Sequence, residues 1–472
     1  MMHVPKEVSY AASSMTVTRN SFTLETAGAT SAAATNVVTI HLPEGASHVD
    51  LRSFAVFFQV ETAPGEAAAN GGSIVHAKVA RVEDLIQGIE IYIGGSQVTQ
   101  ISDFNSVCRM YKIPCVSRDY AESVAATLSG ERIDNTERVA QNRSLCLSLG
   151  GLPGLFGESS VRYLNTALCG SISVRLTMAA NSVLVYKQTE VAGAGAAGDA
   201  LNVGADFGGG GGADGRAAAA LAKYTVSEIR ATIDTLNFGP EMDRMLMERL
   251  SQEQFLPVNF MHYETFNDLS FASDHVSRFT LSSSSVETVL AGLRRSNFAE
   301  SGIKSRAMSG VTLTESILPN AFSFLSFKSG IFASPQSVKN LANNTMTVQY
   351  TANGIKHPQY PMSALNACHH LALMDNKIAK YSSGNMITSL GHFQTGCAVF
   401  PLVLNMPGEP MHVRTGYDSR GANTSFEVEF RNITPIAQND DTQDTGLMSA
   451  FVAAQTKRQL RIAANRQVAF DA

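Results

Sequence analysis

The sequence contains no tryptophan, and only 16% of its 472 residues are charged. Without tryptophan, its 24 Phe and 12 Tyr give no sign of carbohydrate stacking beyond the ordinary. Apolar residues make up 44% of the chain, which is typical of a protein that buries much of its surface. A chain of this length is too long for one ordinary core, so two domains are expected.

Membrane and secretion signals are also missing. No apolar run approaches the roughly 20 residues that a membrane-spanning helix needs, and the N-terminus has no apolar stretch typical of a secretory signal. The cysteines form no C-x-x-C pair, so neither a disulfide framework nor a zinc site is predicted. Buried thiols in a reducing compartment fit best. The six are Cys108, Cys115, Cys146, Cys169, Cys368 and Cys397.

The charge balance disfavours close contact with nucleic acid. The formal net charge is −5, and no run of Lys and Arg lies near the N-terminus, whereas proteins that wrap nucleic acid usually carry a basic arm or face. The one basic concentration is "TKRQLRIAANRQ" near the end, with Lys457, Arg458, Arg461 and Arg466.

The dominant hydrophobic period is two, which predicts β-strands. "IEIYI" (89–93), "ISVRLTM" (172–178) and "FEVEF" (426–430) alternate apolar and polar residues, and "LRSFAVFFQVET" (51–62) is a nearly continuous apolar run. The dipeptides Gly94-Gly95 and Asn353-Gly354 favour hairpin turns. The pattern predicts a mostly antiparallel all-β protein.

A few short helices are expected in the connections, at 118–132, 239–255, 283–298 and 362–381. In the third, Ser284 and Glu287 read as a capping box before an apolar stripe. The helices do not alternate regularly with strands, so a doubly wound α/β sheet is not supported. A turn glycine precedes a cysteine by nearly the same distance in each half (Gly95 and Cys108, Gly354 and Cys368), which favours two similar β units, 1–240 and 241–472.

One stretch spells a dinucleotide-binding fingerprint. Gly193, Gly195 and Gly198 have the G-x-G-x-x-G spacing, but a phosphate cradle needs a helix directly after the turn. Ten glycines lie between Gly193 and Gly215, and each costs a helix about 1 kcal/mol. The tract 191–216 is therefore predicted to be a flexible surface insertion.

No other motif predicts chemistry. Adjacent His369 and His370, even with Cys368, His357 and His392 nearby in sequence, lack a metal-ligand spacing because neighbouring helical residues point about 100° apart. Asp440, Asp441 and Asp444 lack the spacing of a calcium loop and suit a solvated linker. No catalytic, metal-binding or cofactor-binding residue is predicted, no cofactor is expected, and the chain is not predicted to be an enzyme.

With this strand layout in place, the sequence resembles the double jelly-roll major capsid proteins of double-stranded DNA viruses, especially those of virophages and polinton-like viruses. The first half has a "DL" phrase before a long apolar strand, then an acidic leucine-containing segment, "GG", and a phrase leading into a helix; "ISDFN" stands where a Tyr is more usual. Phrases similar to later strands are "SISVRLTMA", "YTVSEIRATIDTLNF", "TVQYTANGIKHPQYPMS" and "HVRTGYDSRGANTSFEVEF". The first-half phrases correspond to Asp50-Leu51, 83–86, Gly94-Gly95 and 101–105.

The resemblance implies two tandem eight-stranded antiparallel jelly rolls and a structural role. Chains of this family form pseudo-hexagonal homotrimers that tile an icosahedral shell, with long loops as outward-facing towers. Partners would be further copies of the chain, together with penton and minor capsid proteins. Sequence-specific nucleic-acid binding is not expected, and an internal membrane is compatible but not indicated. The expected location is the virion, after synthesis inside the host cell without a signal peptide.

Three points stay open at this stage. The segment 447–472, free of Gly and Pro after Gly446, could form a helix or arm that reaches a neighbour or the inner lining of the shell, or a frayed surface tail. The strands suit equally a viral spike, penton or minor capsid protein, or a glycan-binding adhesin. The alternative of a nucleotide-dependent enzyme is supported by the glycine tract alone.

Overall fold

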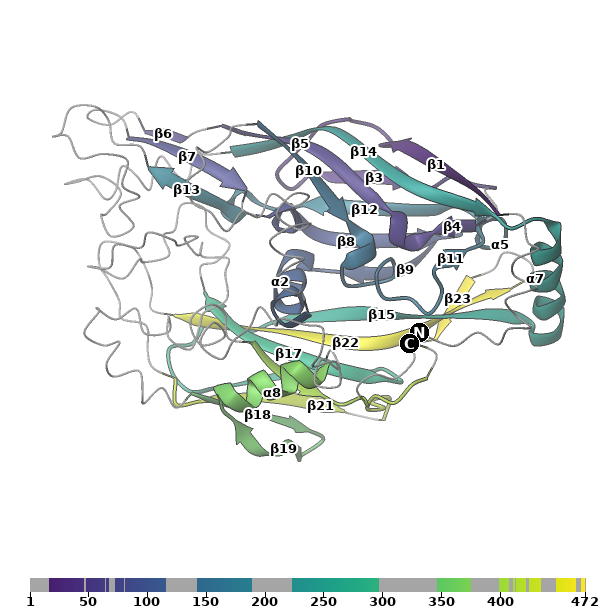
Figure 1. Ribbon diagram of the computed structural model, residues 1–472. Helices are drawn as coiled ribbons and strands as arrows, with labels where there is room; N and C mark the ends of the chain where they lie inside the picture. The colour runs from purple at the N-terminus through teal and green to yellow at the C-terminus, as the bar shows by residue number, and fades with distance from the viewer. Residues whose placement is uncertain are drawn as a thin grey trace, which may run out of the picture.

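A computed structural model of the chain describes residues 17–45, 48–63, 65–67, 73–79, 81–115, 142–188, 223–296, 346–374, 399–406, 411, 413–421, 424–433, 447–463 and 468–471 (Figure 1). The helix expected over 118–132 and the glycine-rich insertion 191–216 lie outside these residues.

Strands up to residue 237 pair only with one another, in three antiparallel sheets. The first has the order β10-β5-β14-β4-β11, and β1 and β2 also pair with β14; the second has the order β3-β12-β8-β9; the third is small, β13-β7-β6. These strands are β1 (Thr18–Glu25), β2 (Ala32–Ala33), β3 (Val37–His41), β4 (His48–Asp50), β5 (Ala55–Ala63), β6 (Gly65–Ala67), β7 (Ser73–Val79), β8 (Ile86–Ile93), β9 (Ser96–Ile101), β10 (Asn142–Ser148), β11 (Tyr163–Leu164), β12 (Ile172–Met178), β13 (Leu184–Gln188) and β14 (Lys223–Asn237).

Strands from residue 255 onward form two further antiparallel sheets. One has the order β15-β22-β17-β20, with β23 paired to β22, and the other β16-β21-β18-β19. The strands are β15 (Phe255–Asn267), β16 (His275–Thr280), β17 (Val286–Arg295), β18 (Thr347–Ala352), β19 (Ile355–Met362), β20 (Val399–Val403), β21 (Ser425–Arg431), β22 (Met448–Ala463) and β23 (Val468–Asp471).

The two halves repeat one topology. The eight main strands of the first half are β1, β3, β5, β8, β9, β10, β12 and β14 in chain order; those of the second are β15 to β22. In both, the first, eighth, third and sixth strands lie side by side in one sheet, and the second, seventh, fourth and fifth in the other. Two four-stranded antiparallel sheets joined in this order form a jelly roll. The chain is therefore two tandem eight-stranded jelly rolls, as predicted.

Within the described residues, helices are few and short, and they occupy connections between strands. The predicted helix at 239–255 is α7, which begins at Pro240, and the one at 362–381 is the shorter α8. The helical segments are η1 (Leu51–Ser53), η2 (Val82–Leu85), α2 (Phe104–Cys115), η4 (Leu149–Gly151), α5 (Thr166–Cys169), η5 (Asn181–Val183), α7 (Pro240–Glu253) and α8 (Ala364–Met374).

The equivalent layout of the two halves is confirmed at the fourth and fifth strands. β8 and β9 are joined by Gly94-Gly95, and β18 and β19 by Asn353-Gly354, and all four residues have positive φ. Two consecutive positive φ angles match the right-handed twist of the flanking strands, which is why Gly and Asn are favoured there. A helix follows the fifth strand in each half, α2 after β9 and α8 after β19.

The helix expected over 283–298 is not formed, because this segment contains the strand β17. β17 lies between β22 and β20, and its residues 286–294 are buried on both faces. Val289 faces the core of the second jelly roll, whereas Leu290 joins the core that the first jelly roll shares. A strand covered on both faces loses its alternation, so its apolar residues also fit a helical stripe. Glu287 is not a cap; its carboxylate lies 3.3 Å from the buried Lys457 ammonium.

Residues 448–463 form neither a helix nor a separate arm. They are β22, the eighth strand of the second jelly roll, which pairs with β15 on one side and β17 on the other. Residues 448–454 are all buried. The basic residues of this segment therefore serve the fold: Arg458 pairs with Glu264 at 2.7 Å, and the Arg461 guanidinium lies over the Phe255 ring.

The two ends of the molecule differ in the connections between strands that they carry. In the first jelly roll, segment 64–72 follows β5, which ends at Ala63, and segment 189–222 precedes β14, which begins at Lys223. These two strand ends are paired with one another. In the second jelly roll, segment 297–345 follows β17, which ends at Arg295, and segment 434–446 precedes β22, which begins at Met448. These two strand ends are also paired. Helix α7 lies at the opposite end of the molecule (Figure 1). Each jelly roll thus gathers its long connections at one end.

Removing 447–472 should abolish folding, whereas shortening 193–215 to a few glycines should not. The first deletion takes away β22 and leaves the edges of β15 and β17 without partners. The second shortens a segment that the sequence predicts to be a loop, and the closure cost of a loop varies by less than about 1 kcal/mol for each doubling of length. Circular dichroism melts and gel filtration would distinguish the two. A cooperative melt of the 447–472 deletion would contradict the assignment of β22 to the core.

Candidate functional site

The sequence predicts no catalytic, metal-binding or cofactor-binding residue, so the polar clusters of the fold are the candidate sites. In the part of the chain that the structure describes, no group of three His, Cys, Asp or Glu side chains could hold a metal, and no helix there is long and apolar enough to cross a bilayer. Cys108, Cys146 and Cys169 form no disulfide and are buried, as expected of structural thiols. The rings of His369 and His370 stand at 75° to one another, 6.0 Å apart. His392 and Asp440 fall outside the described residues, with the glycine fingerprint.

The two jelly rolls meet along the free edge of β15. Segment 158–160 of the first jelly roll runs beside this edge: the Ser160 N–H donates to the Asn259 carbonyl at 2.7 Å, and the Met261 N–H donates to the Glu158 carbonyl at 3.0 Å. The Asn259 N–H donates to the Ser160 hydroxyl at 2.9 Å. A strand edge that would otherwise present unpaired backbone groups is thus closed by the other half of the chain. We call this contact the junction.

The Glu158 side chain turns into the junction. It accepts hydrogen bonds from the Tyr263 hydroxyl at 2.9 Å and from the Gly154 N–H at 3.1 Å. The Gln455 amide of β22 donates to the Tyr263 hydroxyl at 2.8 Å. Burial raises the pKa of Glu158 to about 7, although its hydrogen bonds act in the opposite direction.

A second polar contact crosses the junction at His262, the residue before Tyr263 on β15. The Thr99 hydroxyl of β9 lies 2.8 Å from His262 Nδ1. Burial, followed by the nearby Arg458 charge, lowers the pKa of His262 to about 3, so its ring is neutral at physiological pH. A neutral imidazole fits an interface where a bare charge would be costly.

Arg294 of β17 forms the third crossing. It is wholly buried, donates to the Ser106 hydroxyl of α2 at 3.2 Å and hydrogen-bonds the Asn267 side chain. Its guanidinium lies 4.7 Å from the centre of the Phe451 ring. Burial lowers the pKa of Arg294 to about 10, which leaves it charged at neutral pH. Asn267 in turn donates to the Asp103 carboxylate at 2.9 Å, so both jelly rolls supply groups to this cluster.

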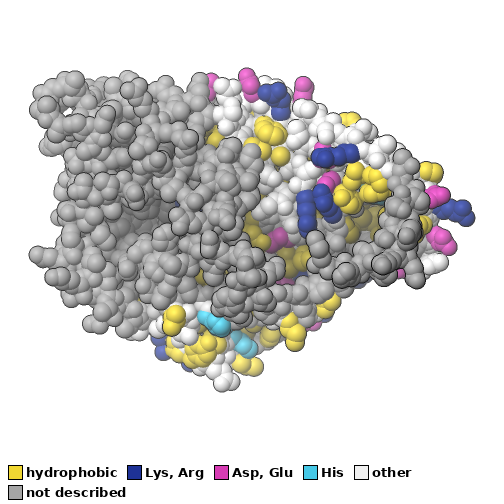
Figure 2. Space-filling model, in the orientation of Figure 1, with side chains coloured by type: hydrophobic (Ala, Val, Ile, Leu, Met, Phe, Trp, Pro, Cys, Tyr) yellow, Lys and Arg dark blue, Asp and Glu magenta, His cyan; other side chains and the backbone are white. Residues whose placement is uncertain are grey.

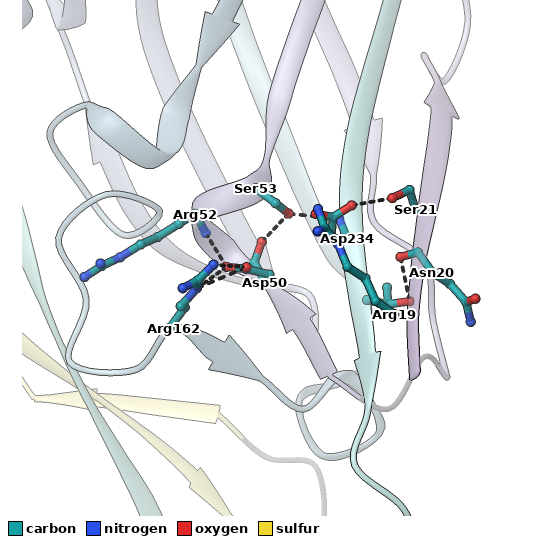
Figure 3. A network of polar contacts seen from close by, with 9 residues as sticks. Arg19, Asn20, Ser21, Asp50, Arg52, Ser53, Arg162 and Asp234 are labelled. Carbon is teal, nitrogen blue, oxygen red and sulfur yellow. Dashed lines mark hydrogen bonds and ion pairs between the residues drawn. The ribbon is translucent and has the colours of Figure 1, made fainter. Parts of the chain in front are cut away.

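Two further polar groups hold the first jelly roll itself. The Asp84 carboxylate is fully buried and accepts two hydrogen bonds from Arg109, at 2.8 and 2.7 Å, tying η2 to α2. In Figure 3, Asp50 accepts from Arg162, and Ser53 connects the Asp50 backbone to Asp234 of β14. Both Asp50 and Asp84 belong to phrases that resemble capsid proteins, but their partners lie 112 and 25 residues away.

The outer surface is mixed in character. On the face in Figure 2, hydrophobic side chains form separate groups with Lys, Arg, Asp and Glu between them. Exposed apolar side chains include Ile355, Tyr360 and Leu365 on β19 and α8, and Met245 and Met247 on α7. The described surface thus offers several apolar contact points.

Truncating Arg294 tests the third crossing. Arg294→Ala should lower the free energy of unfolding by about 2–4 kcal/mol, because it leaves a cavity and removes the donor to Asn267. The matched control is Arg278→Ala, since Arg278 is 73% exposed and pairs with Glu427 at the surface; its cost should stay below about 1 kcal/mol. Urea titrations give both values. Equal costs would show that Arg294 contributes no more than a surface ion pair.

Gly157 tests the loop that carries Glu158. A Cβ atom there would lie 2.1 Å from the Leu152 carbonyl oxygen, whereas a Cβ at Gly88 would meet its neighbours no closer than 3.6 Å. Gly157→Ala should therefore cost about 1–3 kcal/mol, as overpacking does. Gly88→Ala should be neutral or gain up to about 1 kcal/mol. Thermal melts at one pH are sufficient, and a harmless Gly157→Ala would mean that the loop can move away.

The comparisons with known proteins agree with this topology. Neither protein-family models nor curated protein sequences match the chain. Among solved structures, VP54 of the virus PBCV-1, fitted into a reconstruction of the virophage Sputnik, aligns over 97% of both chains with a TM-score of 0.59 and 14% identity. The quasi-atomic model of the PBCV-1 capsid aligns over 97% of both chains at 0.57 and 14%. The Faustovirus major capsid protein aligns at 0.49 and 10%, over 95% of this chain and 91% of its own. The chain therefore has the double jelly-roll fold of viral capsid proteins.

Proposed function

We propose that the chain is a major capsid protein, whose homotrimers form pseudo-hexagonal capsomers that tile an icosahedral shell. The observation that carries this proposal is the repeated eight-strand order, in an alignment that covers 97% of the PBCV-1 protein and 97% of this chain. Three copies of a chain built from two similar jelly rolls place six similar units around one axis, which suits a hexagonal footprint.

The junction supports a rigid building block. Backbone pairing along β15 and the Arg294 cluster join the two jelly rolls, and second-half residues such as Phe260 and Leu460 belong to the same hydrophobic core as the first half. A shell needs subunits whose contact surfaces keep a fixed relative orientation. A continuous core meets this need better than a flexible linker would.

The two ends of the molecule suit the two sides of a shell. In this proposal the end with the long connections faces outward, and the α7 end faces the interior. Direct binding of the genome is not part of the proposal, since Lys457, Arg458 and Arg461 all interact within the fold. The proposed units are 1–240 and 241–472, with α7 at their boundary.

The remaining parts of the proposal concern partners and location. The chain would contact further copies of itself, with penton and minor capsid proteins closing the shell, in the virion. A structural role without enzymatic activity agrees with the polar clusters, whose described members bond mainly to one another.

Light scattering and negative-stain microscopy of purified protein test the capsomer. A particle of three times the chain mass of 50.4 kDa, with a hexagonal outline, is the expected result. A chain that stays monomeric at all concentrations would contradict the proposal. Glycan binding by such a monomer would favour an adhesin instead.

A further inference from the structure

Glu158 occupies an unusual position for a carboxyl group. It is the residue whose backbone carbonyl receives the Met261 N–H across the junction, and its side chain is turned into the same contact. Among the described residues it forms no ion pair with Lys, Arg or His. The groups that face it are the hydroxyls of Tyr263 from β15 and Tyr111 from α2, the Gly154 N–H of its own loop, and, beside Tyr263, the Gln455 amide from β22.

A carboxyl in such surroundings has two states with different effects on its neighbours. When it holds a proton, the group is neutral and the junction contains no net charge at this point. When it loses the proton, a negative charge remains at an apolar contact with only hydrogen bonds to stabilise it. Exposure of the carboxylate to water then becomes favourable relative to burial. Hydration of the side chain pulls on the 154–160 loop, whose backbone closes the β15 edge.

We propose that Glu158 is a proton-controlled lock between the two jelly rolls: with the proton bound, the 154–160 loop is held on β15, and loss of the proton loosens it. The lock is a property of the folded chain and does not rest on shell formation. A failed capsomer assay would therefore leave it standing, and its own failure would leave the capsid proposal standing.

The direction with pH follows from the two states. The pKa of Glu158 is raised from 4.5 to about 7 by folding, so its contribution to stability is complete below about pH 4.5 and is lost as pH rises to about 7. His262 acts in a different window, because its pKa is lowered from 6.5 to about 3 and its penalty arises as pH falls below 6.5. Loosening between pH 6.5 and 8 is therefore assigned to Glu158.

Hydrogen exchange of the full-length chain, followed by mass spectrometry at pH 6.5 and pH 8 and corrected for the intrinsic exchange rate, tests the lock. Peptides covering 157–161 and 259–263 should lose about fourfold in protection at pH 8, because the loss for a group with pKa 4.5 in the open state and about 7 in the closed state levels off above pH 7. Glu158→Gln keeps acceptors for Tyr263 and Gly154 but cannot ionise, so its protection should not change with pH. The control Glu264→Gln removes a partner of Arg458 on the same strand and should keep the loss of the unmodified chain.

Tyr263→Phe supplies a test that does not depend on the folding of Glu158→Gln. Without the phenol, the ionised carboxylate loses a donor, so the pH at which protection is lost should move upward. A purely structural role of Tyr263 would lower protection equally at both pH values. Equal protection of the unmodified chain at pH 6.5 and pH 8, or the same loss in Glu158→Gln, would overturn the proposal.

Discussion

Closure of the β15 edge is the constraint on which the rest of the structure depends. An edge strand inside a large protein must pair its backbone groups or expose them to water. Here the first jelly roll supplies the partner, through Ser160 and the Glu158 carbonyl. This pairing brings β15 next to β9 and places Thr99 beside His262. Residues 259–261 of the second jelly roll thus find their backbone partners in the first.

The few charged residues are used as connectors. A chain with 16% charged residues buries several of them, and three of these buried charges meet groups from other elements: Asp84 meets Arg109, Glu287 meets Lys457, and Arg294 meets Ser106. Such contacts need not add much to stability, because desolvation offsets the attraction. Their geometry does restrict how the elements can be arranged, since a misplaced partner would leave a charge buried alone.

The fold class was accessible from the sequence, and the polar clusters were not. Alternation at 172–178 and 426–430 predicted β12 and β21, because one face of each is buried and the other reaches solvent. The same reasoning failed at β17 and the start of β22, where both faces are covered and the periodicity disappears. The junction could not be predicted, because Glu158 and Tyr263 are 105 residues apart and neither belongs to a motif. Such residues carry no signal in the sequence individually, and only folding brings them together.

Joining the two jelly rolls in one chain also limits where other copies can bind. The β15 edge is closed by segment 158–160, and Leu290 and Phe451 of the same sheet belong to the core shared with the first jelly roll. In the proposed capsomer, contacts between copies would therefore use the remaining surfaces. Two of these are the outward faces of β12 and β21, where Arg175 and Glu427 form surface ion pairs with β8 and β16. Equivalent sheets in the two halves thus present different but comparable charged faces, which agrees with the pseudo-hexagonal capsomer proposed above.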